Sequence, residues 1–585
     1  MKYSTLPVRN SSRNMVDTFK GYNHNLRIGD GEFFDMKNMT SDYYPLISPR
    51  GKRGVYTGAE NPQGLIAKDS LCYVDGTDFV INGYHVDMGL STAEEDCPKQ
   101  LISMGAYVII MPDKKYINTL DLTDFGSMEA SFVTSSDVTF ALCTIDGAAY
   151  SGATASASEP ENPENLALWI DTSSTPHTLK QYSATSAMWV SIATTYIKIS
   201  SPGIGAAFQQ YDGITISGVL DENLKDLNNT MVVWACGDDY IVVVGILDAV
   251  ATQSIDDGAI TVERRLPHMD FIAESENRLW GCRYGVARNG EVVNEIYASK
   301  LGDFKNWNCF MGISTDSWVG SCGTDGQFTG ALAMPGYVVF FKENCLHKVY
   351  GNYPANFQIQ TTVCRGVQRG CERSLAIVNE IIYYKARHAI CAYDGSLPTE
   401  ISAAMGEERY NNAVAGAHGN KYYISMEDLN GNYQLFVFDT AKGMWHKEDN
   451  LRADAFCSCR EELYCIDHDT KQIITMLGSG TQDADKVSWM VQTGIIGTDM
   501  PDMKYISRLT VRMSLELGAR VRFLAQYNSM GGWEPLGTIS GTNMRSFSIP
   551  IRPKRCDHFR LRIEGTGDAK IYSITKTIEQ GSDIS

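Results

Sequence analysis

The residues best suited to chemistry lie in a few short stretches. Asp-His-Asp at 467–469 could bind a metal or act as an acid–base cluster, but its place between two expected strands favours a polar turn. Cys-Ser-Cys at 457–459 puts both thiols on one strand face with no histidine in phase, so core packing is favoured over zinc; Cys-Asp-His at 556–558 has the same weakness. Asp428 to Asn432 is similar to a calcium loop but lacks the bidentate glutamate that such a loop requires.

Established catalytic motifs are absent from the sequence. It holds no GxSxG, no HExxH, no P-loop and no strand–GxGxxG–helix pattern. Ser314 to Trp318 approaches the Asp-box of sialidase-type propellers but lacks its glycine. We therefore expect no enzymatic activity, no metal and no cofactor.

The stretch from Phe271 to Trp318 predicts the element around which the chain is organised. Arg278 to Tyr284 and Val293 to Ser299 alternate in polarity, and Asn289-Gly290 between them is a strong hairpin signal. Asp303 is a suitable cap for one helical turn, which would place Phe304 and Trp307 on the same side. This pattern predicts a strand pair closed by an aromatic plug, and packing is a better explanation for it than ligand binding.

Short strands, small-residue turns and more apolar strands recur along the chain. The apolar inner strands of successive units are expected to begin at residues 278, 337, 381, 421 and 462, and two further units precede the central stretch. Spacings near 40 to 50 residues, with four strands per unit, are typical of a β-propeller. The fold class predicted is all-β, with seven units visible and six to eight blades accepted.

Two other regions depart from this repeat. A polar stretch at 151–165 leads to Trp169 and Trp189, which indicates a small inserted β-domain, with a short helix or a loop at 219–229. Residues 505–578 alternate strictly in polarity, which predicts a sandwich. The predicted domains are an extended strap at 1–60, first blades at 61–130, an inserted β-rich domain at 131–235, remaining blades at 236–490 and a C-terminal β-sandwich at 491–585.

Composition places limits on the class of protein. The chain has 585 residues, 43% of them hydrophobic, and no apolar run of the roughly 18 residues that cross a membrane. The N-terminus has no apolar signal region. The 15 cysteines are odd in number and form no CxxC pair, which indicates a reducing cytosol.

Charge is distributed unevenly. The net charge of −18 argues against a nucleic-acid grip by the whole protein, yet residues 501–585 hold thirteen basic and eight acidic side chains. Five arginines are expected at outward positions of the sandwich strands. These are Arg512, Arg520, Arg522, Arg560 and Arg562. We expect them to form one face that docks on an acidic surface, such as that of a neighbouring subunit, with surface glycan as the alternative.

The central stretch resembles the packaged-DNA stabilisation, or tail hub and nozzle, proteins of tailed bacteriophages, which include the tail tubular protein B family. The resemblance covers most of the chain outside about 125–165 and rests on a strand with Arg-Leu-Trp, a strand with Ile-Tyr-Ala and a Gly-Asp-x-x-x-Trp segment. The signature residues here are Arg278, Leu279, Trp280, Tyr297, Gly302, Asp303 and Trp307.

The resemblance implies a structural virion protein. It would form a ring, expected to be a hexamer, at the head–tail junction or tail nozzle, retain packaged DNA and conduct it during ejection. Its expected partners are copies of itself, portal, adaptor and other tail proteins, and transiently the phage DNA; it would be assembled in the host bacterial cytoplasm. The alternative is a tail-tip or fibre-associated protein that recognises surface glycan through the sandwich or the Trp169 region. A propeller hydrolase is a weaker third possibility.

Overall fold

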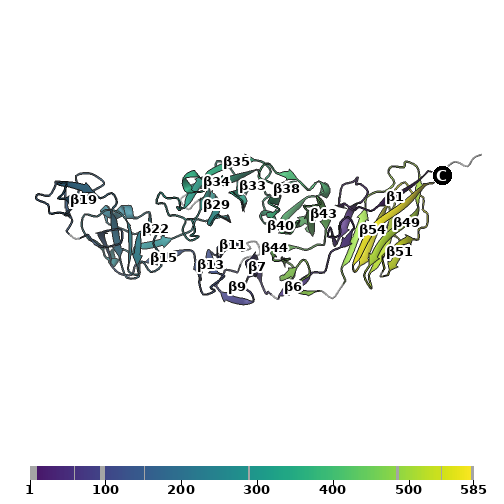
Figure 1. Ribbon diagram of the computed structural model, residues 1–585, viewed down its shortest axis with the longest axis horizontal. Coiled ribbons are helices and arrows are strands. Elements are labelled where there is room, and N and C mark those ends of the chain that lie inside the picture. The colour runs from purple at the N-terminus through teal and green to yellow at the C-terminus, as the bar shows by residue number, and fades with distance from the viewer. Residues whose placement is uncertain are drawn as a thin grey trace, which may run out of the picture. The chain divides into compact units, whose positions relative to one another are not determined.

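The computed structural model describes residues 10–57, 59–92, 99–150, 152–286, 290–482, 486–541 and 543–581 (Figure 1). Strands make up nearly all regular structure in these ranges. The helical elements there are five short 3-10 helices, η1 (Glu222–Leu227), η2 (Ile255–Asp257), η3 (Pro354–Asn356), η4 (Glu372–Ser374) and η5 (Ala403–Met405). Over the same ranges, no helix has the length and apolar character needed to span a membrane. The predicted all-β fold, a propeller with a sandwich, is confirmed.

Seven sets of four neighbouring strands form the propeller blades within the described ranges, inside the predicted range of six to eight. Five of these sets are separate sheets, and the other two belong to larger sheets. Blades 1 to 3 comprise β7 (Pro62–Ala67), β8 (Leu71–Asp75), β9 (Asp78–Ile81) and β10 (Tyr84–Asp87); β11 (Gln100–Met104), β12 (Tyr107–Met111), β13 (Lys115–Asn118) and β14 (Phe125–Ser127); and β28 (Phe271–Ser275), β29 (Arg278–Val286), β30 (Val292–Ala298) and β31 (Trp318–Ser321).

The later blades follow the same strand order. Blades 4 and 5 comprise β32 (Phe328–Met334), β33 (Tyr337–Lys342), β34 (Cys345–Tyr350) and β35 (Gln358–Val363); and β36 (Ala376–Val378), β37 (Ile381–Lys385), β38 (Ile390–Tyr393) and β39 (Thr399–Glu400). Blades 6 and 7 comprise β40 (Tyr410–His418), β41 (Lys421–Asp428), β42 (Tyr433–Asp439) and β43 (Met444–Lys447); and β44 (Ala453–Cys459), β45 (Glu462–Asp467), β46 (Gln472–Thr475) and β6 (Gly54–Thr57), with β47 (Thr481–Gln482) beyond.

Blade 6 shows how the sequence produces such a sheet. Asn430-Gly431 joins β41 to β42, and Gly431 has φ of +83°, the left-handed region that a tight turn requires. The turn sets the register, with Ile424 opposite Phe436, and both side chains are buried. Because these central strands are covered on both faces, they are almost continuously apolar.

The chain forms two compact units. The first comprises Met1–Lys99, Phe341–Leu346 and Thr362–Ser585, and so holds blades 1, 5, 6 and 7 with the C-terminal sandwich. The second comprises Gln100–Phe340 and His347–Thr361, which hold blades 2 and 3 and the inserted domain. Blade 4 is divided between them.

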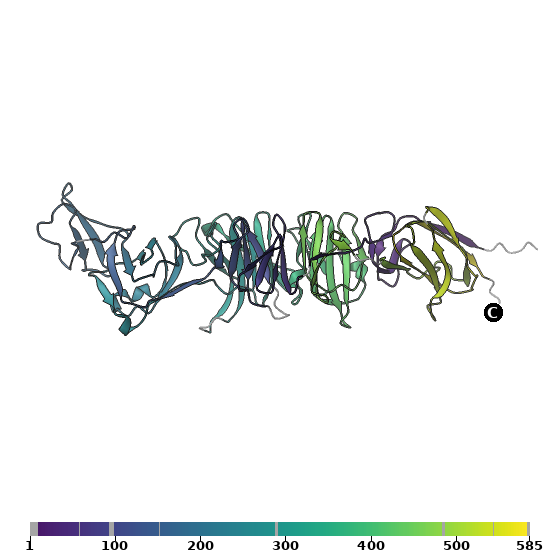
Figure 2. The same cartoon turned by 90° about the horizontal axis from the view of Figure 1, so that it is seen from below.

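The C-terminal sandwich contains two sheets, and both take strands from the N-terminal segment. The first sheet has the order β1 (Ser11–Val16), β54 (Ala569–Gln580), β49 (Lys504–Leu515) and β52 (Arg545–Ile549). The second has the order β3 (Glu32–Lys37), β48 (Ser488–Thr493), β53 (Phe559–Thr566), β50 (Arg520–Tyr527) and β51 (Glu534–Ser540). Figure 2 shows the purple N-terminal strands among the yellow C-terminal ones.

The segment predicted as a strap at 1–60 is thus an integral part of four sheets. Besides β1 and β3, it supplies β2 (Gly21–Tyr22), which links the sheet of blade 6 to the sandwich, the β4 (Met39–Thr40) and β5 (Ser48–Pro49) pair, and β6, which completes blade 7. Val55 of β6 lies opposite Ile474 of β46. Phe33, Met36 and Met39 are buried, so apolar contacts as well as strand pairing fix this segment.

The inserted domain is larger than the predicted 131–235. Its sheets comprise β15 (Ala130–Val133), β27 (Thr261–Arg264), β22 (Gly213–Ser217) and β23 (Thr230–Val232); β24 (Ala235–Gly237), β25 (Tyr240–Val244), β21 (Tyr196–Ser200), β16 (Val138–Cys143) and β26 (Ala251–Gln253); and β17 (Thr154–Ser156), β18 (Leu168–Asp171), β19 (Thr178–Ser183) and β20 (Met188–Ser191). The predicted end at 235 falls at the start of the β24–β25 pair, so the domain cannot end there. The rings of Trp169 and Trp189 lie 5.4 Å apart in the small third sheet.

Candidate functional site

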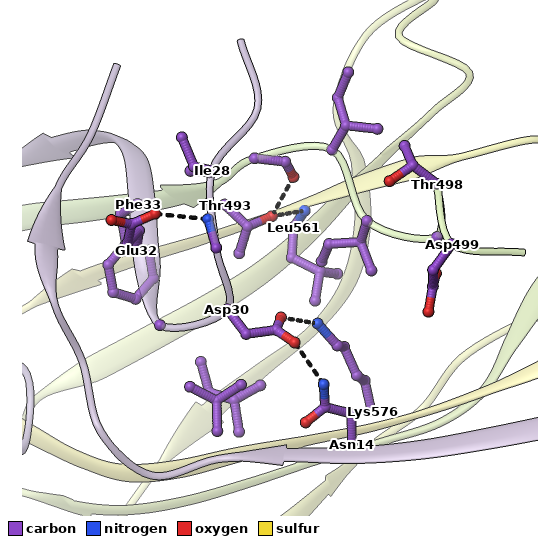
Figure 3. Close-up of a pocket in the computed structure, with 18 of the residues that line it drawn as sticks. Asn14, Ile28, Asp30, Glu32, Phe33, Thr493, Thr498, Asp499, Leu561 and Lys576 are labelled. Carbon is purple, nitrogen blue, oxygen red and sulfur yellow. Dashed lines mark hydrogen bonds and ion pairs between the residues drawn. The ribbon is translucent and has the colours of Figure 1, made fainter. Parts of the chain in front are cut away.

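A cavity of about 270 Å³ opens in the C-terminal sandwich, where the loop before β3 meets the loop after β48 (Figure 3). We call it the sandwich pocket. Its walls combine apolar and polar side chains. The residues that line it include Asn14, Phe19, Ile28, Asp30, Glu32, Phe33, Thr498, Asp499, Leu561, Ile574 and Lys576.

One side of the pocket is organised by an ion pair. The Lys576 ammonium donates to one Asp30 carboxylate oxygen, and the Asn14 amide donates to the other (Figure 3). The Lys576 side chain is 8% exposed, whereas that of Asp30 is 49% exposed. A nearly buried ammonium needs a counter-charge, so Lys576 holds Asp30 at the rim while its carboxylate stays accessible to a ligand.

The loop that carries Asp30 is held by local geometry. The Glu32 carboxylate accepts a hydrogen bond from the Gly29 amide at 2.6 Å. Gly31 has φ of +92°, and a Cβ there would lie 2.4 Å from the Thr18 carbonyl oxygen. Only glycine fits this close approach, which restricts the conformation of the loop that carries Asp30.

The opposite side of the pocket comes from the loop after β48. The Thr493 hydroxyl accepts from the Leu561 amide at 3.0 Å and donates to the Gly494 carbonyl at 3.0 Å, which fixes the start of this loop. Figure 3 shows Thr498 and Asp499 facing the cavity across from Asp30. Both residues are exposed.

Apolar side chains line the rest of the pocket. Phe19, Phe33, Leu561 and Ile574 are buried there, because they belong to the sandwich core or to the N-terminal strands packed on it. A cavity with apolar walls and a few convergent polar groups is the usual form of a small-molecule site. Three carboxylates, Asp30, Glu32 and Asp499, face one ammonium, so the site disfavours anions.

No local pattern in the sequence marks these residues. Asp30 and Lys576 are 546 positions apart: Lys576 lies on β54, opposite Asn14 of β1, and Asp30 lies in the loop before β3. Lys576 falls within the sandwich predicted at 505–578, and an ammonium on the apolar face of β54 is the one unusual feature of that strand. That buried lysine is the signal that could have located the site.

The seven signature residues of the central stretch lie in blade 3 and serve packing. Arg278 is 2% exposed and donates to the Ser299 and Asp316 carbonyls at 2.7 and 2.6 Å. Trp280 packs against Trp318 and Phe357. The arginine therefore ties the end of one strand to the loop that follows the next.

The aromatic plug is present, although its local structure differs from the prediction. Leu279, Phe304 and Trp307 share one core, and the Trp307 indole donates to the Phe304 carbonyl at 2.9 Å. Asp303 caps a non-helical turn, accepting from the Lys305 amide at 3.0 Å, so the predicted helical turn does not form.

The remaining signature residues also have structural roles. Gly302 has φ of +75°, and the Tyr297 hydroxyl donates to Glu295 at 2.7 Å. Asn289 of the predicted hairpin turn lies outside the described residues, but β29 and β30 pair as the prediction requires.

The five predicted docking arginines do not share one face. Arg520, Arg522, Arg560 and Arg562 lie on β50 and β53 of the second sandwich sheet. Arg512 lies on β49 of the other sheet, and therefore on the opposite outside of the sandwich. Strand alternation predicts which residues point outward but not which sheet carries them, and this is why the prediction merged two faces.

The short chemical motifs form no reactive site. His468 Nδ1 lies 2.8 Å from Asp454 in the turn after β45, and Asp428 accepts from the amides of Asn430 and Asn432 within its own loop. Burial raises the pKa of the Cys457 thiol to about 12, which keeps it protonated. Among the described residues, no group of three or more His, Cys, Asp or Glu side chains could hold a metal ion.

Comparison with known proteins gives only distant likenesses. Neither a family model nor a curated protein matches the chain. An exo-β-1,3-galactanase from Phanerochaete chrysosporium with galactose is similar at 8% identity and TM-score 0.22, covering 52% of this chain and 94% of its own. AztD from Citrobacter koseri has 9% identity, TM-score 0.25 and coverage of 74% and 95%. A GH43 glycoside hydrolase has 9% identity, TM-score 0.19 and coverage of 53% and 97%.

These comparisons correct the family resemblance. The similar structures include glycoside hydrolases, and those named here are not phage tail proteins. The predicted membership of the phage nozzle family, the predicted role in closing the capsid and conducting DNA, and the predicted lack of enzymatic activity are therefore wrong. The signature misled because its residues pack a propeller blade. No observation bears on the predicted partners or location, and the low TM-scores transfer no substrate to this chain.

Proposed function

We propose that this protein recognises carbohydrate and that the sandwich pocket holds one sugar residue. The observation that carries the proposal is the pairing of an apolar wall with the fixed Asp30–Lys576 pair and with Asp499 across the cavity. A pyranose ring has apolar C–H faces and a rim of hydroxyls that both donate and accept. The pocket offers the same division between its walls and its polar groups.

Size and charge narrow the class of ligand. The cavity of 270 Å³ lies just below the roughly 300–1,000 Å³ of drug-sized sites, which suits a single small ring. Three carboxylates beside one ammonium repel phosphate and carboxylate ligands. They accept hydrogen bonds from hydroxyls, and each bond to a charged group contributes about 1.5–3 kcal/mol. A neutral sugar is therefore favoured over a nucleotide or an acidic metabolite.

The test is calorimetric titration of the full chain with neutral monosaccharides and short oligosaccharides. We expect saturable binding that Asp30→Asn and Asp499→Asn each weaken at least tenfold. Asp568→Asn is the matched control, because it removes the same charge at an exposed position outside the pocket. If a panel of neutral sugars gives no heat while amines do, the pocket is a cation site and the proposal fails.

Glycoside hydrolysis is a second candidate, favoured by the presence of three carboxylates around one sugar-sized pocket. Glycosidases act with two carboxyl groups about 5–9.5 Å apart. Asp499 would be one of the two, and the second would be Asp30 or Glu32, of which Asp30 is paired with Lys576 and Glu32 accepts the Gly29 amide. Release of reducing ends that Asp499→Asn abolishes would establish hydrolysis, whereas binding without release leaves recognition alone.

A further inference from the structure

A second concave surface lies on the outside of the sandwich, away from the pocket. It occupies about 440 Å³ on the outer face of the second sheet, and we call it the basic groove. The charged side chains that line it are Lys37, Arg520, Arg522, Arg562 and Glu564. Four cations thus face one carboxylate.

The strand register places these charges on neighbouring rungs. Lys37 pairs with Met490, Met490 with Glu564, and Glu564 with Arg522, so one rung crosses four strands. Arg520 lies two residues from Arg522 on the same exposed face. With strands about 4.8 Å apart, Lys37 and Arg522 begin about 14 Å from each other, which spans several units of an extended polymer.

One of the arginines is held in place before any ligand binds. The Arg562 guanidinium stacks on the Trp533 ring at 4.2 Å and donates to the Gln492 amide oxygen at 2.6 Å. Glu564 lies 3.7 Å from it, at the long end of an ion pair. Such restraint lowers the conformational entropy that the side chain would lose on meeting an anion.

The other cations form no close ion pair, although Glu564 lies opposite Arg522 in the strand register. Within the part of the chain that the structure describes, no carboxylate lies within 4 Å of Lys37, Arg520 or Arg522. Clustered like charges on adjacent strands are mildly destabilising. An anionic partner would remove that repulsion.

We propose that the basic groove binds a polyanionic polysaccharide, through carboxylate or sulfate groups spaced along an extended chain. The charges follow one rung across four strands, which suits a linear polymer better than a protein surface, whose stable interfaces bury about 1,200–2,000 Å². Single-stranded nucleic acid is disfavoured because Arg562 already covers the Trp533 ring on which a base would stack. The inference is independent of the neutral-sugar pocket.

The experiment compares two double variants that change the same charge. Arg520→Glu with Arg522→Glu alters the groove, whereas Arg508→Glu with Arg512→Glu alters exposed positions on the opposite sheet. Heparin supplies sulfate groups, polygalacturonate supplies carboxylates, and dextran is the uncharged control. Full-length protein is titrated with each at 50 and 200 mM salt.

We expect wild type to bind at least one polyanion, more weakly at the higher salt, and to ignore dextran. The groove variant should lose at least tenfold in affinity and the control variant less than twofold. If the thermal midpoint of the groove variant falls below that of wild type, the double variant Arg520→Gln with Arg522→Gln is used in its place.

Equal loss in both variants, or no polyanion binding by wild type, would overturn the proposal. If sedimentation shows that wild type and the control variant form oligomers and the groove variant does not, the groove is instead an interface with a second copy of the chain. Preserved neutral-sugar binding in the groove variant would show that the pocket functions separately.

Discussion

Blade 3 and the N-terminal segment both hold strands in place, but they use different interactions. Blade 3 is contiguous in sequence, and its Leu279, Phe304 and Trp307 belong to an apolar core that also includes Met104, Ile109 and Met111 of blade 2. The N-terminal segment contacts partners hundreds of residues away, and it adds ion pairs to its strand pairing and apolar contacts. Arg53 lies 2.9 Å from Glu448, and Asp42 pairs with Lys421. The stability that the apolar core of blade 3 supplies is therefore independent of pH. Part of the stability that the N-terminal segment supplies depends on the ionisation of its charged side chains.

The charged contacts of the N-terminal segment centre on two arginines, Arg50 and Arg53, beside Glu448 and Asp449. Burial alone would raise the pKa of the Asp449 carboxyl, but the guanidiniums of Arg53 and Arg50 outweigh it and hold that pKa below its usual range. Losing one partner would leave a buried charge uncompensated. As the pH is lowered, the contacts of this region should weaken before those of blade 3.

The largest expected effect is in the apolar region. Trp307→Ala should lower the free energy of unfolding by about 3–5 kcal/mol, since it empties a buried aromatic site. Chemical denaturation at pH 7 and pH 5 should give the same loss. Trp189→Ala, at a partly exposed position, is the control. An unchanged unfolding midpoint would show that the plug does not stabilise blade 3.

Acidification should lower the stability of blade 6 where β43 carries His446, near Asp42 of the N-terminal segment. Burial, followed by the nearby Lys421 ammonium, lowers the pKa of His446 to about 3. The unfolded chain protonates this histidine below about pH 6.5 while the folded protein keeps it neutral, so stability falls as pH drops from 6.5 toward 3, by up to about 1.4 kcal/mol per pH unit.

His446→Gln isolates this contribution, because glutamine cannot titrate. Urea denaturation at pH 7 and pH 5 should show a smaller pH dependence in the variant than in wild type. The depressed pKa of Asp449 adds a loss of the same sign, but only below about pH 4, where carboxyls protonate. Parallel curves for the two proteins would contradict the assignment to His446.

A smaller effect is expected where the N-terminal segment meets the pocket. Asp30→Asn removes the counter-charge of nearly buried Lys576 and should cost about 1–3 kcal/mol. Adding Lys576→Met should recover much of that loss, because no unpaired charge then remains. Sugar binding should stay lost in the double variant. Recovery of binding together with stability would show that Asp30 only balances Lys576.

The smallest effect is expected at Arg512. It is exposed on the sheet opposite the basic groove, so Arg512→Glu should change stability by less than about 0.5 kcal/mol and leave polyanion binding intact. A loss of binding comparable with that of Arg522→Glu would restore the single docking face that the sequence predicted. Thermal melts and the heparin titration measure both quantities.

Regular patterns in the sequence determined the fold class. Alternation at 505–527, the turn at Asn430-Gly431 and the recurring strand units predicted a propeller and a sandwich, because these signals depend on neighbours a few residues apart. The packing of Phe304 and Trp307 together could be predicted for the same reason. The function could not be predicted in this way, because residues that pack a propeller blade were interpreted as the signature of a protein family.

Only the tertiary structure decided which distant residues meet. The pairing of β1 with β54 places Asn14 opposite Lys576, and the loop before β3 brings Asp30 to the same lysine. The assignment of β49 and β50 to different sheets separates Arg512 from Arg522. Local propensity predicts a strand and its outward face, but strand pairing across hundreds of residues depends on the packing of the whole sandwich. The amino-acid sequence by itself therefore determined the elements, whereas tertiary pairing created the pocket and the groove.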